Sequence, residues 1–388
     1  MLNFTYDIPT RIHFGRGEIK ALSGELETCA KKVLVVTGQG SVKRNGIFND
    51  VVREIKKAGI PFVELTGIKP NPRLKSVYRG IEICKAEGVD FILAVGGGSV
   101  IDASKAIAAG AKYKNDVWDF FTKDVVCTEA VPLGAVLTLA ATGSEMNSYG
   151  VITKEDTERK LAFGTPLVRP VFSILDPEYT YTVNKYHTSA GIVDIMVHIF
   201  EEYFSAPPTA VVQDRIAEAL LKVCIKYGPI ACKKPKDYEA RANILWAGTL
   251  ALNGLLGNGK SGDWASHGIE HEISAIYDIT HGVGLGIIVP NWMKVVLSKN
   301  TLDKFVEFGI NVWDVDKDKG KEKIANIAIE KTRDFFTALG VPSKLSAVSV
   351  PQDRFRDMAK GAIESYGQVG SFKKLSEEDI VKILTFSL

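Results

Sequence analysis

The residues best suited to chemistry in this chain are a carboxylate and four histidines between Asp194 and His281. Asp194 and His198 are four residues apart, as are His267 and His271, and His281 follows ten residues later. Residues four apart share one face of a helix, so each pair can direct both polar groups at a common point. Imidazole nitrogen and carboxylate oxygen are ligands for Fe(II), Zn(II) and similar ions, and a set that leaves one coordination position open is typical of a catalytic site. The spacing therefore predicts a metalloenzyme.

A structural role for these residues is the alternative to weigh. A lone histidine on a helix is usually hydrogen-bonded or solvated, and one pair spaced by four often occurs by chance. Asp194, however, lies in the segment from Ala190 to Phe200, where almost every neighbour is apolar. A buried carboxylate without a compensating group would cost several kcal/mol or become protonated. A bound cation supplies that compensation directly, so we favour the metal site.

Length, composition and charge indicate the broad class of protein. The chain has 388 residues, 46% hydrophobic and 24% charged, which suits a globular protein of two domains. Its formal net charge is +2 and its Lys and Arg residues are dispersed, so we expect no nucleic-acid partner. No apolar run reaches the roughly 20 residues that span a bilayer, and the amino terminus lacks a signal-peptide pattern. We therefore expect no membrane partner either.

The cysteines indicate the compartment. They are five in number and widely spaced, without a CxxC pair: Cys29, Cys84, Cys127, Cys224 and Cys232. An odd number of dispersed thiols is typical of a reduced intracellular protein. The sequence therefore predicts a cytoplasmic location.

The chain changes character near residue 180. Up to that point short β-branched runs alternate with amphipathic helical stretches, a pattern typical of βαβ units on a mostly parallel sheet. We predict strands over 33–37, 62–65, 91–95 and 135–139, and helices over 49–58 and 74–87. Beyond residue 180 strand-like runs nearly vanish and helical segments dominate. The sequence therefore predicts an α/β domain over residues 1–180 and an all-helical domain over 181–388, which carries every metal candidate.

Two polar residues are candidates for starting the helices of the metal region. Thr188 is the predicted N-cap of the helix that carries Asp194, because its hydroxyl can accept a hydrogen bond from a free backbone N–H group. Asp263 is the corresponding candidate for the helix that carries His267.

A glycine-rich turn in the amino-terminal half is suited to a phosphate group. Gly96-Gly97-Gly98-Ser99 follows the predicted strand 91–95 directly and precedes a helical run. Glycines let the backbone approach a phosphate closely, and the free N–H groups at the start of a helix favour negative charge there. We expect a pyrophosphate at this turn, although the spacing is not that of the G-x-G-x-x-G fingerprint. The alternative is a tight strand-to-helix turn without a ligand.

Two further turns bear on the choice of dinucleotide. Gly38-Gln39-Gly40-Ser41 follows the predicted strand 33–37, and Lys43 and Arg44 are close in sequence. Folds that select NAD commonly place an acidic residue here to hold the ribose 2′-OH, whereas basic or small polar residues accept the extra phosphate of NADP. This turn therefore favours NADP, unless the two cations simply form a solvated helix face. The third turn spans residues 138–147, and its hydroxyl groups could line the same crevice.

Taken together these motifs resemble the iron-containing, or group III, alcohol dehydrogenases, and most closely their butanol dehydrogenase-like branch. The resemblance covers essentially the whole chain. Its elements are Pro70-Asn71-Pro72, Gly96-Gly97-Gly98-Ser99 with Asp102, Ala141-Thr142-Gly143-Ser144-Glu145, Asp194 with His198, and His267-Gly268-Ile269-Glu270-His271 leading to His281-Gly282.

The resemblance implies a role for individual residues. It implies that one divalent metal, Fe²⁺ or Zn²⁺, is held by Asp194, His198, His267 and His281. His271 would then lie close by without ligating, whereas spacing alone would pair it with His267. The implied dinucleotide contacts are Gly38, Ser41, Asn71, Gly96, Gly97, Gly98, Ser99, Asp102, Thr138, Leu139, Asn147 and Lys160. The residues assigned to catalysis besides the metal ligands are His271, as a candidate proton relay, and Asp102.

The chain departs from the family pattern at two places. The family often has Thr-Thr-Ala-Gly where this chain has Thr138-Leu139-Ala140-Ala141, and in this respect the chain resembles the butanol-type branch. That branch often carries three glycines where this chain has Gly38-Gln39-Gly40, and Gln39 bears directly on the choice between NADP and NAD.

The implied activity is hydride transfer between NAD(P)H and a metal-bound aldehyde or primary alcohol, in an enzyme that we expect to be a homodimer. The main alternative is a metal- and NAD-dependent lyase resembling dehydroquinate synthase. Its substrate carries a phosphate and a carboxylate, so Lys and Arg should crowd the metal region, yet residues 192–200 and 263–286 contain neither. A metal-dependent hydrolase would not need the Gly96 to Ser99 turn, and a noncatalytic nucleotide-binding module would not need the ligand set.

Overall fold

The chain forms two compact units, and the computed structural model describes all 388 of its residues. The α/β unit comprises Asp7–Val183 and Lys236–Leu245, and the helical unit comprises Met1–Tyr6, Asn184–Pro235 and Trp246–Leu388. The sequence placed a single division after residue 180. In the structure that division falls three residues later, the first six residues already belong to the helical unit, and the short segment Lys236–Leu245 returns to the α/β unit. No helix combines the length and the apolar character that crossing a bilayer requires.

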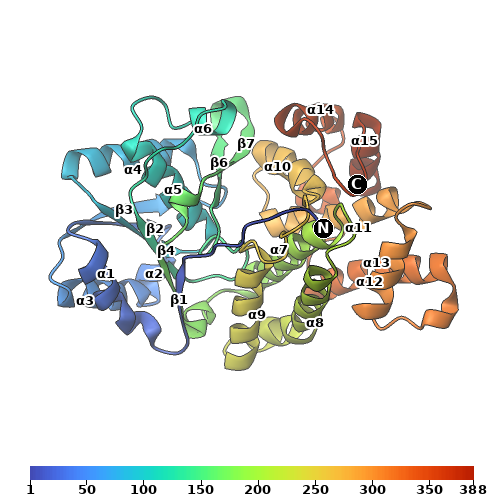
Figure 1. The fold of residues 1–388 in the computed structure, drawn as a ribbon, viewed down its shortest axis with the longest axis horizontal. Coiled ribbons are helices and arrows are strands. Elements are labelled where there is room, and N and C mark those ends of the chain that lie inside the picture. Colours follow the sequence, from blue (N-terminus) through green and yellow to red (C-terminus); the bar gives the residue numbers. More distant parts are fainter. The chain divides into compact units, whose positions relative to one another are not determined.

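A six-stranded parallel sheet forms the centre of the α/β unit, in the order β1-β8-β5-β4-β2-β3 (Figure 1). Leu34 and Val36 of β2 join one apolar cluster, and Val33 and Val35 join the other. Both faces are therefore buried, which is why the strands are continuous apolar runs. The strands are β1 (Arg11–Phe14), β2 (Val33–Gly38), β3 (Phe62–Ile68), β4 (Phe91–Gly96), β5 (Leu133–Leu137) and β8 (Phe172–Leu175), with β6 (Tyr149–Lys154) and β7 (Arg159–Gly164) as a separate antiparallel pair.

Helices cover both faces of this sheet (Figure 1). Residues of α1 and α3 join the cluster of Val33 and Val35, and residues of α4 and α5 join the cluster of Leu34 and Val36. The helices are α1 (Leu22–Cys29), α2 (Ser41–Arg44), α3 (Ile47–Lys57), α4 (Leu74–Glu87), α5 (Gly98–Lys112) and α6 (Asp119–Thr122). This arrangement confirms the predicted α/β class with a mostly parallel sheet.

The strand order reverses at β2, which lies between β3 and β4. After β2 the chain adds β3 on one side and then β4 on the other, so the connections that leave β2 and β4 diverge. Thr37 of β2 is paired with Val95 of β4, so the turns that follow these two strands lie side by side at one edge of the sheet. In open α/β sheets, ligands bind in the crevice at such a reversal point.

The second unit is helical throughout, as predicted. Helix α7 packs against α8, α10 and α11, and α10 also packs against α14. From Thr188 to Tyr203 every residue of α7 is buried. The helices are α7 (Lys185–Tyr203), α8 (Val211–Lys233), α10 (Ala265–Tyr277), α11 (His281–Val296), α12 (Leu302–Asn311), α13 (Lys321–Leu339), α14 (Phe355–Tyr366) and α15 (Glu377–Phe386), while α9 (Tyr238–Ala251) belongs to both units.

Three local predictions are corrected by the structure. Thr188 is not the N-cap of α7, because Asn184 occupies that position and accepts the backbone N–H of His187 at 2.9 Å. Asp263 precedes the N-cap Trp264 by one residue, although it still accepts the N–H of Ala265 at 3.2 Å. The strand predicted over 135–139 begins and ends two residues earlier, because the turn residues after it form no ladder with β4.

Candidate functional site

Helices α7, α10 and α11 bring the four predicted metal ligands together in the helical unit. The Oδ1 atom of Asp194 lies 3.7 Å from Nδ1 of His198, 3.9 Å from Nε2 of His267 and 3.6 Å from Nε2 of His281. The side chains of Asp194, His198 and His267 are almost fully buried, whereas that of His281 is 23% exposed. The cluster is therefore open to solvent on the side of His281.

The donor set fits a divalent cation. Four ligands about 2.1 Å from one tetrahedral ion lie about 3.4 Å from one another, and the separations of the three histidines from Asp194 are only slightly wider. The ligand atoms of Asp194, His267 and His281 all lie within 4.8 Å of one another, whereas His198 is close to Asp194 but outside that group. Nδ1 of His198 is buried and has no hydrogen-bond partner, so an ion would satisfy it. Burial, followed by the nearby His267 and His281, lowers the pKa of His198 well below its ordinary range. The neutral imidazole that results is the form that ligates a metal.

Two buried glutamates lie behind the histidines. Oε1 of Glu201 is 2.9 Å from Nδ1 of His267, and Oε2 of Glu270 is hydrogen-bonded to Nδ1 of His281. Both glutamate side chains are completely buried. Burial raises the pKa of Glu201 to about 8, although backbone N–H groups at the start of α10 favour its ionised form. Sequence reasoning missed Glu201, even though it lies seven residues after Asp194 on the same helical face.

His271 lies beside the ligand set and not on the Asp194 side of it. Its ring centroid is 5.5 Å from that of His281, and its Nδ1 is 2.6 Å from the hydroxyl of Tyr366 in α14. The ligand atoms of Glu270, His271 and His281 also come within 4.8 Å of one another. In that second group, however, Glu270 contacts Nδ1 of His281, while the nitrogen nearest Asp194 is Nε2. We therefore place the candidate ion at Asp194.

A glycine permits the close approach of α11 to α7. A Cβ atom on Gly282 would lie 2.0 Å from the carbonyl oxygen of Ala190, closer than real Cβ atoms come to any heavy atom. Because Gly282 follows His281 directly, this contact determines how near His281 can come to Asp194. The His281-Gly282 motif alone did not indicate this packing role, because the contact is with Ala190 of another helix.

Three aromatic residues that lie near the metal ligands in sequence have different surroundings in the structure. Phe200 and Trp292 are buried in a core of aromatic rings around Phe204. Trp264 is only partly buried, and its ring centroid lies 5.3 Å from that of His267 and 6.3 Å from that of His198. Trp264 is therefore the one of the three that borders the candidate metal site.

In the α/β unit, the glycine-rich turn after β4 packs tightly against the loop that follows β5. A Cβ atom on Gly98 would lie 2.4 Å from Oγ1 of Thr142, and one on Gly97 would lie 3.3 Å from Cβ of Leu139. The N–H of Thr138 also donates to the carbonyl of Gly96 at 3.0 Å. The structure thus brings together two of the three turns that the sequence singled out.

The turn that follows β2 lies at the same edge of the sheet. Gly38 ends β2, and a Cβ atom there would lie 3.7 Å from Val100 in the first turn of α5. Lys43 is paired with Glu64 of β3 at 2.6 Å, while the Arg44 guanidinium lies 3.4 Å from the carbonyl of Gln39. The two cations that favoured NADP therefore have different neighbours: Lys43 is paired with a carboxylate, whereas Arg44 contacts a backbone carbonyl.

A buried lysine joins the segments that form this edge. The Lys105 ammonium is completely buried and donates to Ser144 at 2.8 Å, to Asn147 at 2.8 Å and to the carbonyl of Tyr149 at 2.7 Å. Ser144 donates in turn to Asp102 at 2.6 Å. Burial raises the pKa of Asp102 and lowers that of Lys105 to about 7. Sequence reasoning missed Lys105, although it lies on the helix that begins at the glycine-rich turn.

The remaining predicted dinucleotide contacts lie at or near this edge. Asn71 follows β3, is buried and has a positive φ of 49°. Lys160 of β7 is buried, pairs with Thr153 of β6 and contributes a positive charge near Asp102. These positions are compatible with the predicted contacts, which stay predictions.

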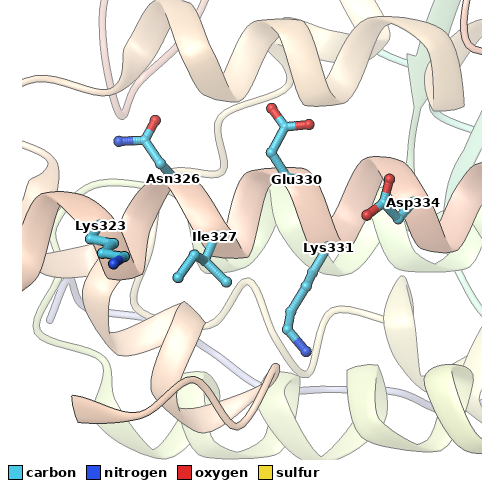
Figure 2. A pocket seen from close by; sticks show the side chains of 6 residues that line it. All are labelled: Lys323, Asn326, Ile327, Glu330, Lys331 and Asp334. Carbon is cyan, nitrogen blue, oxygen red and sulfur yellow. The ribbon is translucent and has the colours of Figure 1, made fainter. Parts of the chain in front are cut away.

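One surface hollow lies away from both clusters. Figure 2 shows it along α13, lined by Lys323, Asn326, Ile327, Glu330, Lys331 and Asp334. Five of these six side chains are exposed and all belong to one helix. The hollow is therefore the solvent-facing side of an amphipathic helix and not a candidate catalytic site.

Comparison with protein families identifies both parts of the chain. The family described as iron-containing alcohol dehydrogenase matches residues 9–177, and the carboxy-terminal part of the same family matches residues 188–388. The chain belongs to the iron-containing alcohol dehydrogenase family. Membership of this family confirms the resemblance drawn from the motifs, while the role of each site residue stays a prediction.

Individual relatives within the iron-containing alcohol dehydrogenase family are similar over their whole length. NADH-dependent butanol dehydrogenase A of Clostridium acetobutylicum is 51% identical over 384 residues, which cover 99% of each chain. NADPH-dependent aldehyde reductase YqhD of Escherichia coli is 41% identical over 350 residues, which cover 89% of each. The crystal structure of NADH-dependent butanol dehydrogenase A from Thermotoga maritima has a TM-score of 0.96 and 38% identity, and the match covers 100% of this chain and 99% of that one.

Proposed function

We propose that this chain interconverts aldehydes and primary alcohols, taking aldehyde, NAD(P)H and a proton to alcohol and NAD(P)⁺. The observation that carries the proposal is the convergence of His198, His267 and His281 on one oxygen of Asp194. Family membership supports it, as do the names of the butanol dehydrogenase and aldehyde reductase relatives. The proposed substrates are small aldehydes and alcohols such as butanal and butanol.

The proposed metal ligands are Asp194, His198, His267 and His281. A divalent ion held there, Fe²⁺ or Zn²⁺, would polarise the substrate oxygen as a Lewis acid. The nicotinamide would supply the hydride to the carbonyl carbon, or accept it in the reverse direction. The side chains around these ligands are buried, so they exclude water from all sides except that of His281.

We assign the proton transfer to His271. Its Nδ1 lies 2.6 Å from the hydroxyl of Tyr366, and we assign the proton exchange with the substrate oxygen to its other nitrogen, Nε2. Burial raises the pKa of Tyr366, so its hydroxyl stays protonated and can donate to His271.

Asp102 is the second residue to which we assign a role in catalysis, and we also propose that it contacts the dinucleotide. Its carboxylate accepts from Ser144 and from the N–H of Val151, so it orders the turn that faces the dinucleotide.

We propose that the chain accepts both NADPH and NADH, and that Arg44 decides between them. The turn after β2 offers no acidic residue to the ribose, which supports NADPH. Lys43 is already paired with Glu64, so Arg44 is the cation left to meet a 2′-phosphate. Replacing Arg44 with Ala should raise KM for NADPH about tenfold and leave KM for NADH within about twofold, since one charged hydrogen bond contributes roughly 1.5 kcal/mol. An equal change for both cofactors would exclude Arg44.

We also propose that the enzyme is a cytoplasmic homodimer. All five cysteines are free thiols, which suits a reducing compartment. Light scattering of the purified enzyme should give twice the mass of the 42.3 kDa chain. A monomeric mass would contradict the dimer without affecting the proposed reaction.

Two histidine variants test the proposed reaction. His267→Ala removes one proposed ligand, so bound metal and turnover of butanal should be lost together. His271→Ala removes the proposed relay, so metal content should stay while turnover slows and its pH profile changes. Retention of both metal and activity in His267→Ala would contradict the ligand set. If the native chain were instead a synthase-like lyase, it would not oxidise NAD(P)H in proportion to added aldehyde.

A further inference from the structure

Two of the proposed metal ligands are each held by a carboxylate from a neighbouring helix. Glu201 lies on α7, three residues after His198, and its Oε1 is 2.9 Å from Nδ1 of His267 on α10. Glu270 lies on α10, three residues after His267, and its Oε2 contacts Nδ1 of His281 on α11. Helix α7 therefore orients a ligand of α10, and α10 orients a ligand of α11.

Each carboxylate is itself fixed in place. Oε1 of Glu201 also accepts the backbone N–H of His267 at 3.1 Å, so the first turn of α10 holds the same oxygen that contacts Nδ1. Glu201 thus occupies the positive end of the α10 dipole. The other oxygen of Glu270 accepts the hydroxyl of Ser274, one turn further along α10. Neither side chain has any exposed surface, so neither can reorient into water.

The nitrogen that each glutamate contacts has a chemical consequence. A carboxylate on Nδ1 stabilises the imidazole tautomer that carries its proton there, which leaves the lone pair on Nε2. Nε2 is the atom of both His267 and His281 that lies nearest Asp194. The same contact makes Nε2 of the imidazole a stronger electron-pair donor to a metal ion. Removing such a carboxylate partner typically lowers metal affinity about 10- to 100-fold.

We propose that Glu201 and Glu270 are positioning residues that set the metal affinity of this site by fixing the tautomer and the ring orientation of His267 and His281. The inference rests on the proposed function, because it requires that a metal binds at Asp194. It adds two residues that need not touch the metal, the substrate or the dinucleotide. Packing supports it, since a Cβ atom on Gly284 of α11 would lie 2.8 Å from Cγ of Glu270. The approach of α11 thus leaves room for this carboxylate only because residue 284 is a glycine.

Glutamine variants with a matched control test the proposal. Glu201→Gln and Glu270→Gln keep side-chain size but remove the negative charge and introduce an N–H₂ group that can face Nδ1. Glu202→Gln is the control, because Glu202 is a buried neighbour of Glu201 on the same helix but lies beside Gly257 and Lys260, and no histidine. Zn²⁺ dissociation constants are measured by chelator competition on the metal-free full chain, and Co²⁺ absorption spectra report the geometry of the site.

The proposal predicts that Zn²⁺ affinity falls about 10- to 100-fold in Glu201→Gln and in Glu270→Gln, and stays within about twofold in Glu202→Gln. It also predicts altered Co²⁺ bands in the first two variants only. The thermal midpoints of their metal-free forms should be no lower than that of the native chain, because an amide costs less to bury than a carboxylate. Equal Zn²⁺ affinity in all four proteins would overturn the proposal, as would an equal loss in the control.

A second variant keeps the test decisive if a glutamine variant does not fold. Ser274→Ala leaves Glu270 in place but removes the hydroxyl that holds it, so Zn²⁺ affinity should fall by a smaller factor, about threefold to tenfold. Glu201→Asp shortens the carboxylate beyond reach of His267 and should weaken Zn²⁺ binding as Glu201→Gln does. Native-like affinity in both of these variants would overturn the proposal. A native chain that binds neither Zn²⁺ nor Co²⁺ would instead refute the proposed function.

Discussion

Replacing Gly282 with Ala should disable the metal site without touching any ligand. The new Cβ atom would start 2.0 Å from the carbonyl oxygen of Ala190, and real Cβ atoms essentially never come within 3.0 Å of a heavy atom. The start of α11 must therefore move by at least the difference, 1.0 Å, away from α7. The obstacle is backbone, so no side-chain rotation can relieve it.

That displacement is large compared with what a metal site tolerates. Metal–ligand distances hold within about 0.2 Å, so a shift of 1.0 Å at His281 is several times too large for it to remain a ligand. We expect Zn²⁺ affinity to fall at least 100-fold and the metal-free protein to lose about 1–3 kcal/mol of unfolding free energy through overpacking.

Isothermal titration of the metal-free variant with Zn²⁺, together with denaturant unfolding, measures both quantities. Gly228→Ala is the matched control, because Gly228 of α8 also faces α7, but its Cβ atom would meet the side chain of Ile192 at 3.2 Å. That side chain can adjust, so the control should keep native Zn²⁺ affinity. Native affinity in Gly282→Ala would show that the approach of α11 to α7 does not position His281, and our reasoning would fail.

Three further predictions concern other parts of the molecule. Lys105→Met should lower the unfolding free energy by about 3–5 kcal/mol and weaken NAD(P)H binding, measured by fluorescence, because it leaves a buried polar cluster uncompensated. The control Lys112→Met, at the exposed end of α5, should change the unfolding free energy by less than about 0.5 kcal/mol. Equal effects of the two substitutions would show that Lys105 does not hold this cluster together. Trp264→Ala should lower kcat/KM for butanal about 10-fold or more relative to acetaldehyde at unchanged metal content, and an unchanged ratio would place the alkyl chain elsewhere. Burial raises the pKa of Cys84 and of Cys224 to about 12, so little thiolate forms at about pH 8. Alkylation of both thiols by iodoacetamide should therefore be slow until denaturant is added. Fast labelling of either thiol in the native protein would contradict that burial.

The sequence predicted those features that local patterns determine. The predicted helix 74–87 matches α4 residue for residue, because its apolar spacing lies within one element and Gly88 ends it in a left-handed conformation. Strands β2 and β4 were found because both of their faces are buried, so their residues form continuous apolar runs. The four metal candidates came from spacing together with the family resemblance, and the structure brings them together.

The features that sequence reasoning missed depend on contacts between distant segments. Glu201 and His267 are 66 residues apart, and His271 and Tyr366 are 95 residues apart, so no local pattern links either pair. Thr188 has the chemistry of an N-cap, yet α7 begins earlier because Asn184 also has it and nothing between them breaks the helix. Lys105 reads as a surface cation, since only the folded loop from Ser144 to Tyr149 supplies the acceptors that allow its burial.

The central claim is that hydride transfer by this chain depends on a metal held by Asp194, His198, His267 and His281. The most direct test follows the nicotinamide absorbance of NADH and NADPH with butanal, using native enzyme, chelator-stripped enzyme and stripped enzyme resupplied with Fe²⁺ or Zn²⁺. We predict that stripping abolishes oxidation of both cofactors, that one equivalent of metal per chain restores it, and that His267→Ala cannot be restored. Full activity in stripped enzyme confirmed to be metal-free by elemental analysis would contradict the account.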